Sequence, residues 1–105
     1  MFAENDKRRL YWLIDQYLSG KMSAWDFTRE LHVSYDISIE YEDLTELEDE
    51  TFLDLSNVAG RFSPFEEDLR DPGAHYSEAE LHVKVIETKK ILAQQFTEYE
   101  AQLEQ

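Results

Sequence analysis

The side chains that could do chemistry in this chain are three histidines and twenty-four carboxylates, since it has no cysteine. His32, His75 and His82 never follow a glutamate by three residues, so the Glu-x-x-His pairs of di-iron bundles are absent. The chain also lacks His-Glu-x-x-His, a glycine-rich phosphate loop, Gly-x-Ser-x-Gly and the spacing of a calcium loop. No carboxylate pair is singled out for acid–base work. We therefore predict no enzyme, no metal site and no cofactor.

The carboxylates indicate recognition instead, because they are concentrated in one stretch. No Lys or Arg lies between Arg29 and Arg61, and ten acids in that interval supply most of the net charge of −14. Such a local field repels nucleic acid and anionic membranes and attracts a basic partner. The ten acids are Glu30, Asp36, Glu40, Glu42, Asp43, Glu46, Glu48, Asp49, Glu50 and Asp54.

Length and composition predict one globular domain over residues 1–105. The apolar content of 42% and the aromatic content of 13% are enough for one packed core. Three glycines and two prolines leave few tight turns, which disfavours an all-β fold. The sequence has neither a signal peptide pattern nor an apolar run of about 20 residues, so we expect a cytoplasmic protein.

The first two helices that must position these acids have clear limits. Apolar residues at 3/4 spacing over 10–18 predict a helix that Ser19-Gly20 ends. Ser23 is expected to cap a second helix, with Asp26 near its positive end. The predicted apolar face of this second helix contains Trp25, Phe27, Leu31 and Tyr35.

Residues 36–44 alternate between apolar and polar, which predicts an extended connection with Ile37 and Ile39 on the core. A capping box at 45–48 opens the third helix, which Ser63-Pro64 ends. A loop over 63–76 follows, and a second capping box at 77–80 opens one long last helix with a Glu80–Lys84 pair outside. The predicted fold is an all-α antiparallel four-helix bundle with an extended acidic connection between helices 2 and 3. The last two apolar faces are Leu47, Phe52, Leu55, Val58, Ala59 and Phe62, then Leu81, Val85, Leu92, Phe96, Tyr99 and Leu103, with Ile86 beside the latter.

One part of the acidic stretch is not explained by helix formation. Acids in the first turn of the third helix interact favourably with its dipole. Glu46, Glu50 and Asp54, however, form an i, i+4, i+8 stripe of like charge, and each such pair costs roughly 0.2–0.5 kcal/mol. This unrelieved cost favours a partner-binding role. The candidate partner-binding residues are Asp36, Glu40, Tyr41, Glu42, Asp43, Glu46, Asp49, Glu50 and Asp54, with a secondary group of Glu66, Glu67 and Asp68.

Several stretches resemble the colicin D immunity-type family of bacterial toxin immunity proteins. They are Leu-Ile-Asp-Gln-Tyr-Leu-Ser-Gly-Lys-Met-Ser-Ala-x-x-Phe at 13–27, the helix at 52–62, Ser63-Pro64, Leu-Arg-Asp at 69–71, and Tyr-Ser-Glu-Ala-Glu-Leu at 76–81. The resemblance implies a small four-helix bundle that protects a bacterium from its own nuclease toxin, including toxins of contact-dependent growth inhibition. It also implies that the acidic surface covers the basic cleft of a toxin that cleaves tRNA.

The resemblance thus implies a cognate basic toxin domain as partner, and we expect a free monomer that binds neither nucleic acid nor membrane. Two alternative binding classes remain open, and a third alternative, an enzyme or metal carrier, would be favoured by a tightly bound divalent metal in the purified protein. An acidic secretion chaperone would expose an apolar groove and dimerise. A nucleic-acid-mimicking regulatory binder would compete with DNA for a housekeeping protein.

Overall fold

The computed structural model describes residues 2–71 and 73–104, and the chain within these ranges is helical apart from its connections. Within these ranges, one isolated β-bridge joins Phe62 to Tyr76. The α-helices are α1 (Arg8–Leu18), α2 (Ala24–Leu31), α3 (Glu46–Ala59), α4 (Glu66–Leu69), α5 (Glu78–Ile91) and α6 (Ala93–Leu103), with a π-helix η1 (His32–Ser38) and a 3-10 turn η2 (Tyr41–Asp43) between α2 and α3.

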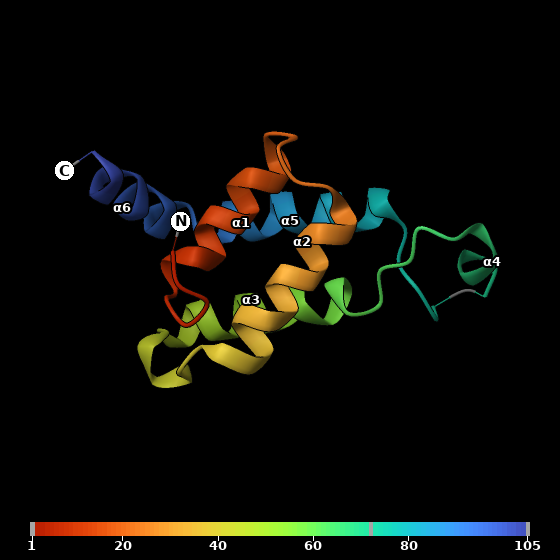
Figure 1. The fold of residues 1–105 in the computed structure, drawn as a ribbon, viewed down its shortest axis with the longest axis horizontal. Helices are drawn as coiled ribbons and strands as arrows, with labels where there is room; N and C mark the ends of the chain where they lie inside the picture. The colour runs from red at the N-terminus through yellow and green to blue at the C-terminus, as the bar shows by residue number, and fades with distance from the viewer. Residues whose placement is uncertain (1, 72, 105) are drawn as a thin grey trace.

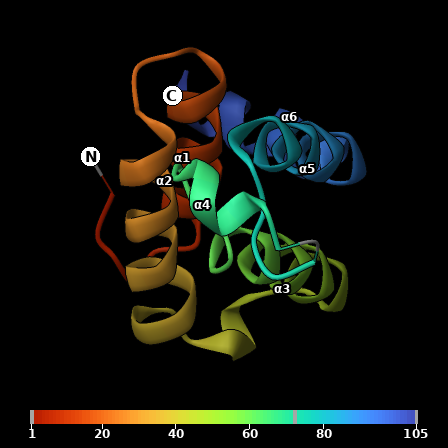
Figure 2. The same ribbon diagram turned by 90° about the vertical axis from the view of Figure 1, so that its right-hand side faces the viewer.

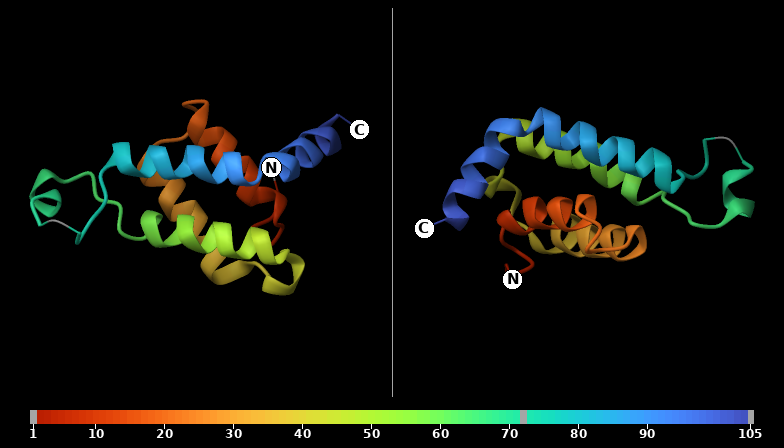
Figure 3. Two further views of the ribbon diagram at one scale, coloured as in Figure 1. Left: turned by 180° about the vertical axis from the view of Figure 1, so that it is seen from behind. Right: turned by 90° about the horizontal axis from the view of Figure 1, so that it is seen from above.

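The main helices form two layers. The antiparallel pair α1 and α2 lies on one side of the core, and the antiparallel pair α3 and α5 lies on the other (Figures 1 and 2). Seen from above, α6 leaves the line of α5 at an angle, while α4 and its loop project from the opposite end (Figure 3). The layers enclose a continuous apolar core to which every α-helix except α4 contributes.

The predicted starts of the second, third and last helices are confirmed, because each has a capping side chain. Helix α1 begins at Arg8, before the predicted span of 10–18, and its N-cap residue Lys7 makes no side-chain cap hydrogen bond. Ser23 accepts a hydrogen bond from the Asp26 N–H at 3.1 Å. Thr45 with Glu48, and Ser77 with Glu80, form reciprocal capping boxes at the starts of α3 and α5. These bonds satisfy backbone N–H groups that have no partner inside the helix. The predicted stop after α1 is also confirmed, since Gly20 has a positive φ of 79°.

The predicted extended connection over 36–44 is wrong for most of its length. The chain continues from α2 into η1, where the Ile39 N–H donates to the Ser34 carbonyl five residues back. Only Ile39, Glu40 and Leu44 are extended around the η2 turn. Ile39 is buried as predicted, whereas Ile37 is 67% exposed. The wider π turn rotates the later side chains, so the alternation in sequence did not correspond to two faces of a strand.

The predicted single last helix is also wrong, because Leu92 interrupts it with φ −97° and ψ 25°. The Thr88 hydroxyl donates to the Lys84 carbonyl at 2.8 Å, a local bond that bends helices. The bend accompanies the packing of α6 on α1, where the rings of Phe96 and Tyr99 lie 4.7 and 5.7 Å from the Tyr11 ring. Leu103, predicted on the apolar face, is exposed near the end of α6.

Two further details differ from expectation. Helix α3 ends at Ala59, before the predicted stop, and the loop after it is closed by hydrogen bonds between Ser63 and Tyr76 and between Tyr76 and Arg61. Lys84 pairs with Glu87 at 3.3 Å, because the Glu80 carboxylate is held in its capping box.

Trp25, predicted on the apolar face of the second helix, is 49% exposed. Residues two apart on a helix differ by about 200°, so Trp25 and Phe27 cannot share one face.

Candidate protein-binding surface

Most of the predicted partner-binding acids lie together on one exposed surface. This acidic surface follows the chain from Glu40 through η2 and along the outer side of α3. Among the described residues, no side chain forms an ion pair or hydrogen bond with any of its six carboxylates, which keeps the charge available for a partner. The six are Glu40, Glu42, Asp43, Glu46, Glu50 and Asp54, and all are exposed.

The remaining predicted residues of this group hold the surface together. Asp36 pairs with His32 at 2.6 Å and accepts a hydrogen bond from Ser56 at 3.0 Å, which joins η1 to α3. Asp49 accepts a hydrogen bond from the Tyr35 hydroxyl at 2.7 Å. The Tyr41 hydroxyl donates to the Tyr35 carbonyl at 3.1 Å, which joins η2 to η1. The structure thus gives Asp36 and Asp49 positioning roles within the protein.

Exposed apolar side chains accompany the acids. Ile37 and Tyr41 are exposed on the segment that precedes α3, and Leu53 is 49% exposed on α3 itself. Asp49, Leu53 and Ser56 share one side of α3 at i, i+4 and i+7, and both Asp49 and Ser56 bond to η1. Leu53 therefore lies beside η1. Aromatic and apolar residues within a charged rim are the usual anatomy of a protein interface.

The predicted secondary acidic group lies elsewhere. Glu66 and Glu67 are exposed on α4, which projects at the opposite end of the long axis from η2 (Figures 1 and 3). Asp68 accepts a hydrogen bond from the Ser63 hydroxyl at 2.6 Å, and Ser63 in turn accepts the Phe65 N–H at 3.1 Å. Asp68 therefore fixes the start of α4. The structure does not bring this group together with the acidic surface.

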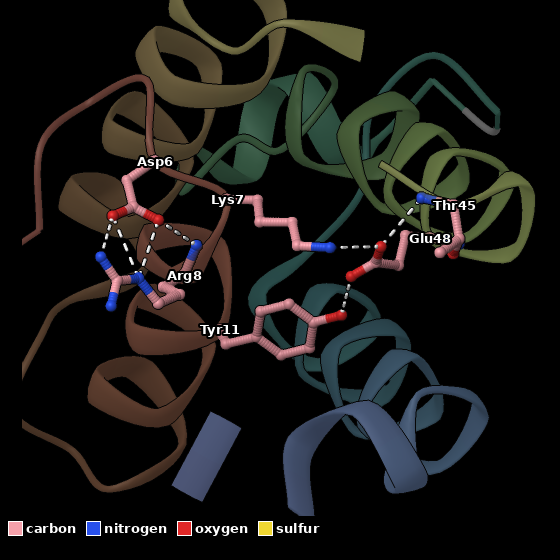
Figure 4. A network of polar contacts seen from close by, with 6 residues as sticks. All are labelled: Asp6, Lys7, Arg8, Tyr11, Thr45 and Glu48. Carbon is pink, nitrogen blue, oxygen red and sulfur yellow. Dashed lines mark hydrogen bonds and ion pairs between the residues drawn. The ribbon is translucent and has the colours of Figure 1, made fainter. Parts of the chain in front are cut away.

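The inner side of α3 carries a carboxylate that sequence reasoning treated only as a helix cap. Glu48 is 2% exposed and lies between α1 and α3. Its Oε1 pairs with the Lys7 ammonium at 3.1 Å and accepts the Thr45 N–H at 2.9 Å, while its Oε2 accepts the Tyr11 hydroxyl (Figure 4). All these groups surround one buried charge. We call Glu48, Lys7, Tyr11 and Thr45 the Glu48 network.

The Glu48 network shifts the titration of its own members. Burial raises the pKa of Glu48, but the hydrogen bonds from Thr45, Tyr11 and Lys7 outweigh it and hold the pKa below its ordinary value. Burial and the hydrogen bond to Glu48 raise the pKa of Tyr11 well above the usual range for tyrosine. Glu48 is therefore a charged acceptor and Tyr11 a neutral donor at neutral pH.

One signal could have located Glu48 from the sequence. Glu48, Phe52, Leu55 and Ala59 occur at i, i+4, i+7 and i+11, the spacing of an inward face. Leu47 was placed on that face because it is apolar, and the structure corrects this, since Leu47 is exposed. Position decides burial here, because Leu47 lies about 100° away from Glu48 around the helix.

Comparisons with protein-family models, curated proteins and solved structures found no match to this chain. Within residues 2–71 and 73–104, no three His, Asp or Glu side chains are grouped closely enough to hold a metal ion. In the same ranges, no helix combines the length and apolar character needed to cross a membrane.

Proposed function

We propose that this protein is an immunity-type inhibitor that binds a basic bacterial toxin domain in the cytoplasm through its acidic surface. The observation that supports this most is the set of six exposed carboxylates with no partner among the described residues. Three of them form the α3 stripe, whose mutual repulsion destabilises the free protein. A basic partner would remove that repulsion on binding.

The proposed mechanism is occlusion of a nuclease active site. Carboxylates along η2 and α3 take the place of RNA phosphates in a basic cleft, while Ile37, Tyr41 and Leu53 supply apolar contacts beside them. Opposite charge also speeds association, which suits capture of a toxin before it acts. In this proposal α1, α2, α3 and the α5–α6 unit are the four helices of an immunity-type bundle, and no reaction is catalysed by the protein.

The test reverses the charge of the stripe. Glu46→Lys, Glu50→Lys and Asp54→Lys together should slow association with the cognate toxin domain, first identified by a pull-down from the source cell, by roughly tenfold or more. Stopped-flow mixing measures the rate, and survival of toxin-expressing cells measures protection. The matched control is Glu4→Lys with Glu100→Lys and Glu104→Lys, which changes net charge equally at other exposed acids. An unchanged association rate in the stripe variant would exclude this surface as the interface.

The same purified proteins distinguish the alternative functions. An inhibitor stops tRNA cleavage by the bound toxin domain, whereas a secretion chaperone binds it without blocking cleavage and dimerises when free. A nucleic-acid mimic would instead displace DNA from a housekeeping DNA-binding protein. Light scattering on the free protein and a cleavage assay on the complex therefore separate the three classes.

A further inference from the structure

A second surface with the opposite character lies between α2 and the C-terminal end of α3. A hollow of about 370 Å³ is lined there by Trp25, Thr28 and Arg29 from α2, by His32 at the start of η1, and by Ala59, Gly60 and Phe62 at and just after the end of α3. This volume is at the lower end of the range for ligand-binding pockets. We call it the Trp25 hollow.

The indole of Trp25 forms an exposed apolar wall of this hollow. Trp25, Arg29 and His32 follow one another at i, i+4 and i+7, so they lie along one side of α2 and its continuation into η1, next to the buried face. Trp25 keeps 49% of its surface exposed, and Phe62, which is partly buried, lines the same hollow. Trp and Arg are the residues most enriched at the energetic centres of protein interfaces.

The charge of the Trp25 hollow differs from that of the protein as a whole. Its lining includes Arg29 and no carboxylate, although the chain holds twenty-four acids against ten Lys and Arg residues. His32 also lines the hollow, but its ring is already paired with Asp36 at 2.6 Å, so Arg29 carries the positive charge there. Three other hollows, one against α6, one in the bend between α5 and α6, and one between α3 and α5, each include at least one glutamate. Within the described chain, no oxygen atom accepts a hydrogen bond from the Arg29 guanidinium. A planar guanidinium can donate two parallel hydrogen bonds to one carboxylate.

We propose that the Trp25 hollow docks a peptide segment of a partner protein in which an apolar side chain adjoins an Asp or Glu. The apolar side chain packs between the Trp25 indole and the Phe62 ring, and the carboxylate binds Arg29. This site complements an acidic partner, whereas the acidic surface complements a basic one. A peptide is favoured over nucleic acid because a polyphosphate chain would meet the net charge of −14. The inference does not depend on the proposed inhibition of a toxin.

The test selects random twelve-residue peptides, displayed on phage, against the full-length immobilised protein, with the Trp25→Ala variant as counter-selection. We expect the enriched peptides to share an apolar residue next to Asp or Glu. Synthetic versions should bind at least tenfold more weakly to Trp25→Ala and to Arg29→Glu, as measured by fluorescence anisotropy. The matched controls are Val83→Ala and Arg70→Glu, which change an exposed apolar residue and an exposed arginine elsewhere, and both should bind normally.

Three outcomes would overturn the inference. Failure to enrich any peptide that distinguishes the protein from Trp25→Ala would show that the hollow docks none. Peptides that bind Arg29→Glu as tightly as they bind the unmodified protein would show that Arg29 does not bind a carboxylate of the peptide. Tighter, Trp25-dependent binding of a single-stranded RNA oligonucleotide would assign the hollow to nucleic acid. The stripe variant of α3 serves as an internal reference, since it should retain peptide binding whether or not the acidic surface inhibits a toxin.

Discussion

Glu48 and Glu50 lie two residues apart on α3 and are in opposite environments. Glu48 is buried and receives hydrogen bonds or an ion pair from three groups, whereas Glu50 is exposed between two other acids of the stripe. The first carboxylate stabilises the packing of α1 against α3. The Glu50 carboxylate repels the two other acids of the stripe, and no basic side chain of the described residues is paired with it. The comparison shows that charge on one helix can stabilise the fold on its inner side while the charge on its outer side has no role within the fold, which is why we propose a partner for it.

The largest effect on stability should come from breaking the inner side. Glu48→Gln removes a charged acceptor and leaves the buried Tyr11 hydroxyl and Lys7 with a weaker partner. We expect the free energy of unfolding to fall by roughly 1–3 kcal/mol. Urea denaturation monitored by circular dichroism measures the change. Glu50→Gln is the matched control and should change it by less than about 0.5 kcal/mol. Equal losses in the two variants would show that the environments do not differ in energy.

The same difference should depend on pH. The folded-state pKa of Glu48 lies below its ordinary value of 4.5, so its charge stabilises the folded state above that pH. The stabilisation is lost as pH falls through the folded-state pKa, because folded and unfolded chains are then both protonated. We therefore expect the gap in unfolding free energy between the natural protein and Glu48→Gln to be constant near neutrality and to shrink below about pH 4.5. A gap that widens in acid would contradict the assigned role.

The smallest effect should have the opposite sign. Glu50→Lys replaces two like-charge i, i+4 contacts, with Glu46 and Asp54, by two attractive ones. Each like-charge pair costs roughly 0.2–0.5 kcal/mol, so the variant should unfold at a higher urea concentration. The gain should decrease in 1 M salt, where the Debye length is about 3 Å. A destabilised variant would mean that Glu50 has a structural partner and that the stripe is not held in repulsion.

The helix starts could be predicted from the sequence because capping is a local interaction. Ser23, Thr45 and Ser77 bond to N–H groups three residues ahead, so neighbours in sequence were enough. The exposed stripe on α3 was predicted for the same reason, since helical spacing alone places Glu46, Glu50 and Asp54 on one side. Burial of Glu48 depended on Lys7 and Tyr11, about forty residues away, as the sequence separations of 41 and 37 show.

The bend at Leu92 and the π-helix η1 were also beyond local reasoning. No proline or glycine marks either place, and both conformations accompany contacts made at long range. The bend accompanies the packing of Phe96 and Tyr99 on Tyr11, and η1 accompanies the bonds of Tyr35 and Asp36 to α3. Intrinsic helix propensity is weak enough for tertiary packing to override it.

By itself, the sequence determined the helical class, the capped starts of α2, α3 and α5, and the concentration of negative charge between Arg29 and Arg61, because these depend on composition and on neighbours within one helical turn. The tertiary structure decided which acids make contacts within the fold and which remain exposed without a side-chain partner among the described residues. It also decided that Trp25 borders an exposed hollow with Arg29. Those outcomes depend on which residues from distant parts of the sequence pack beside each side chain, and the packing of the two helical layers determines these neighbours.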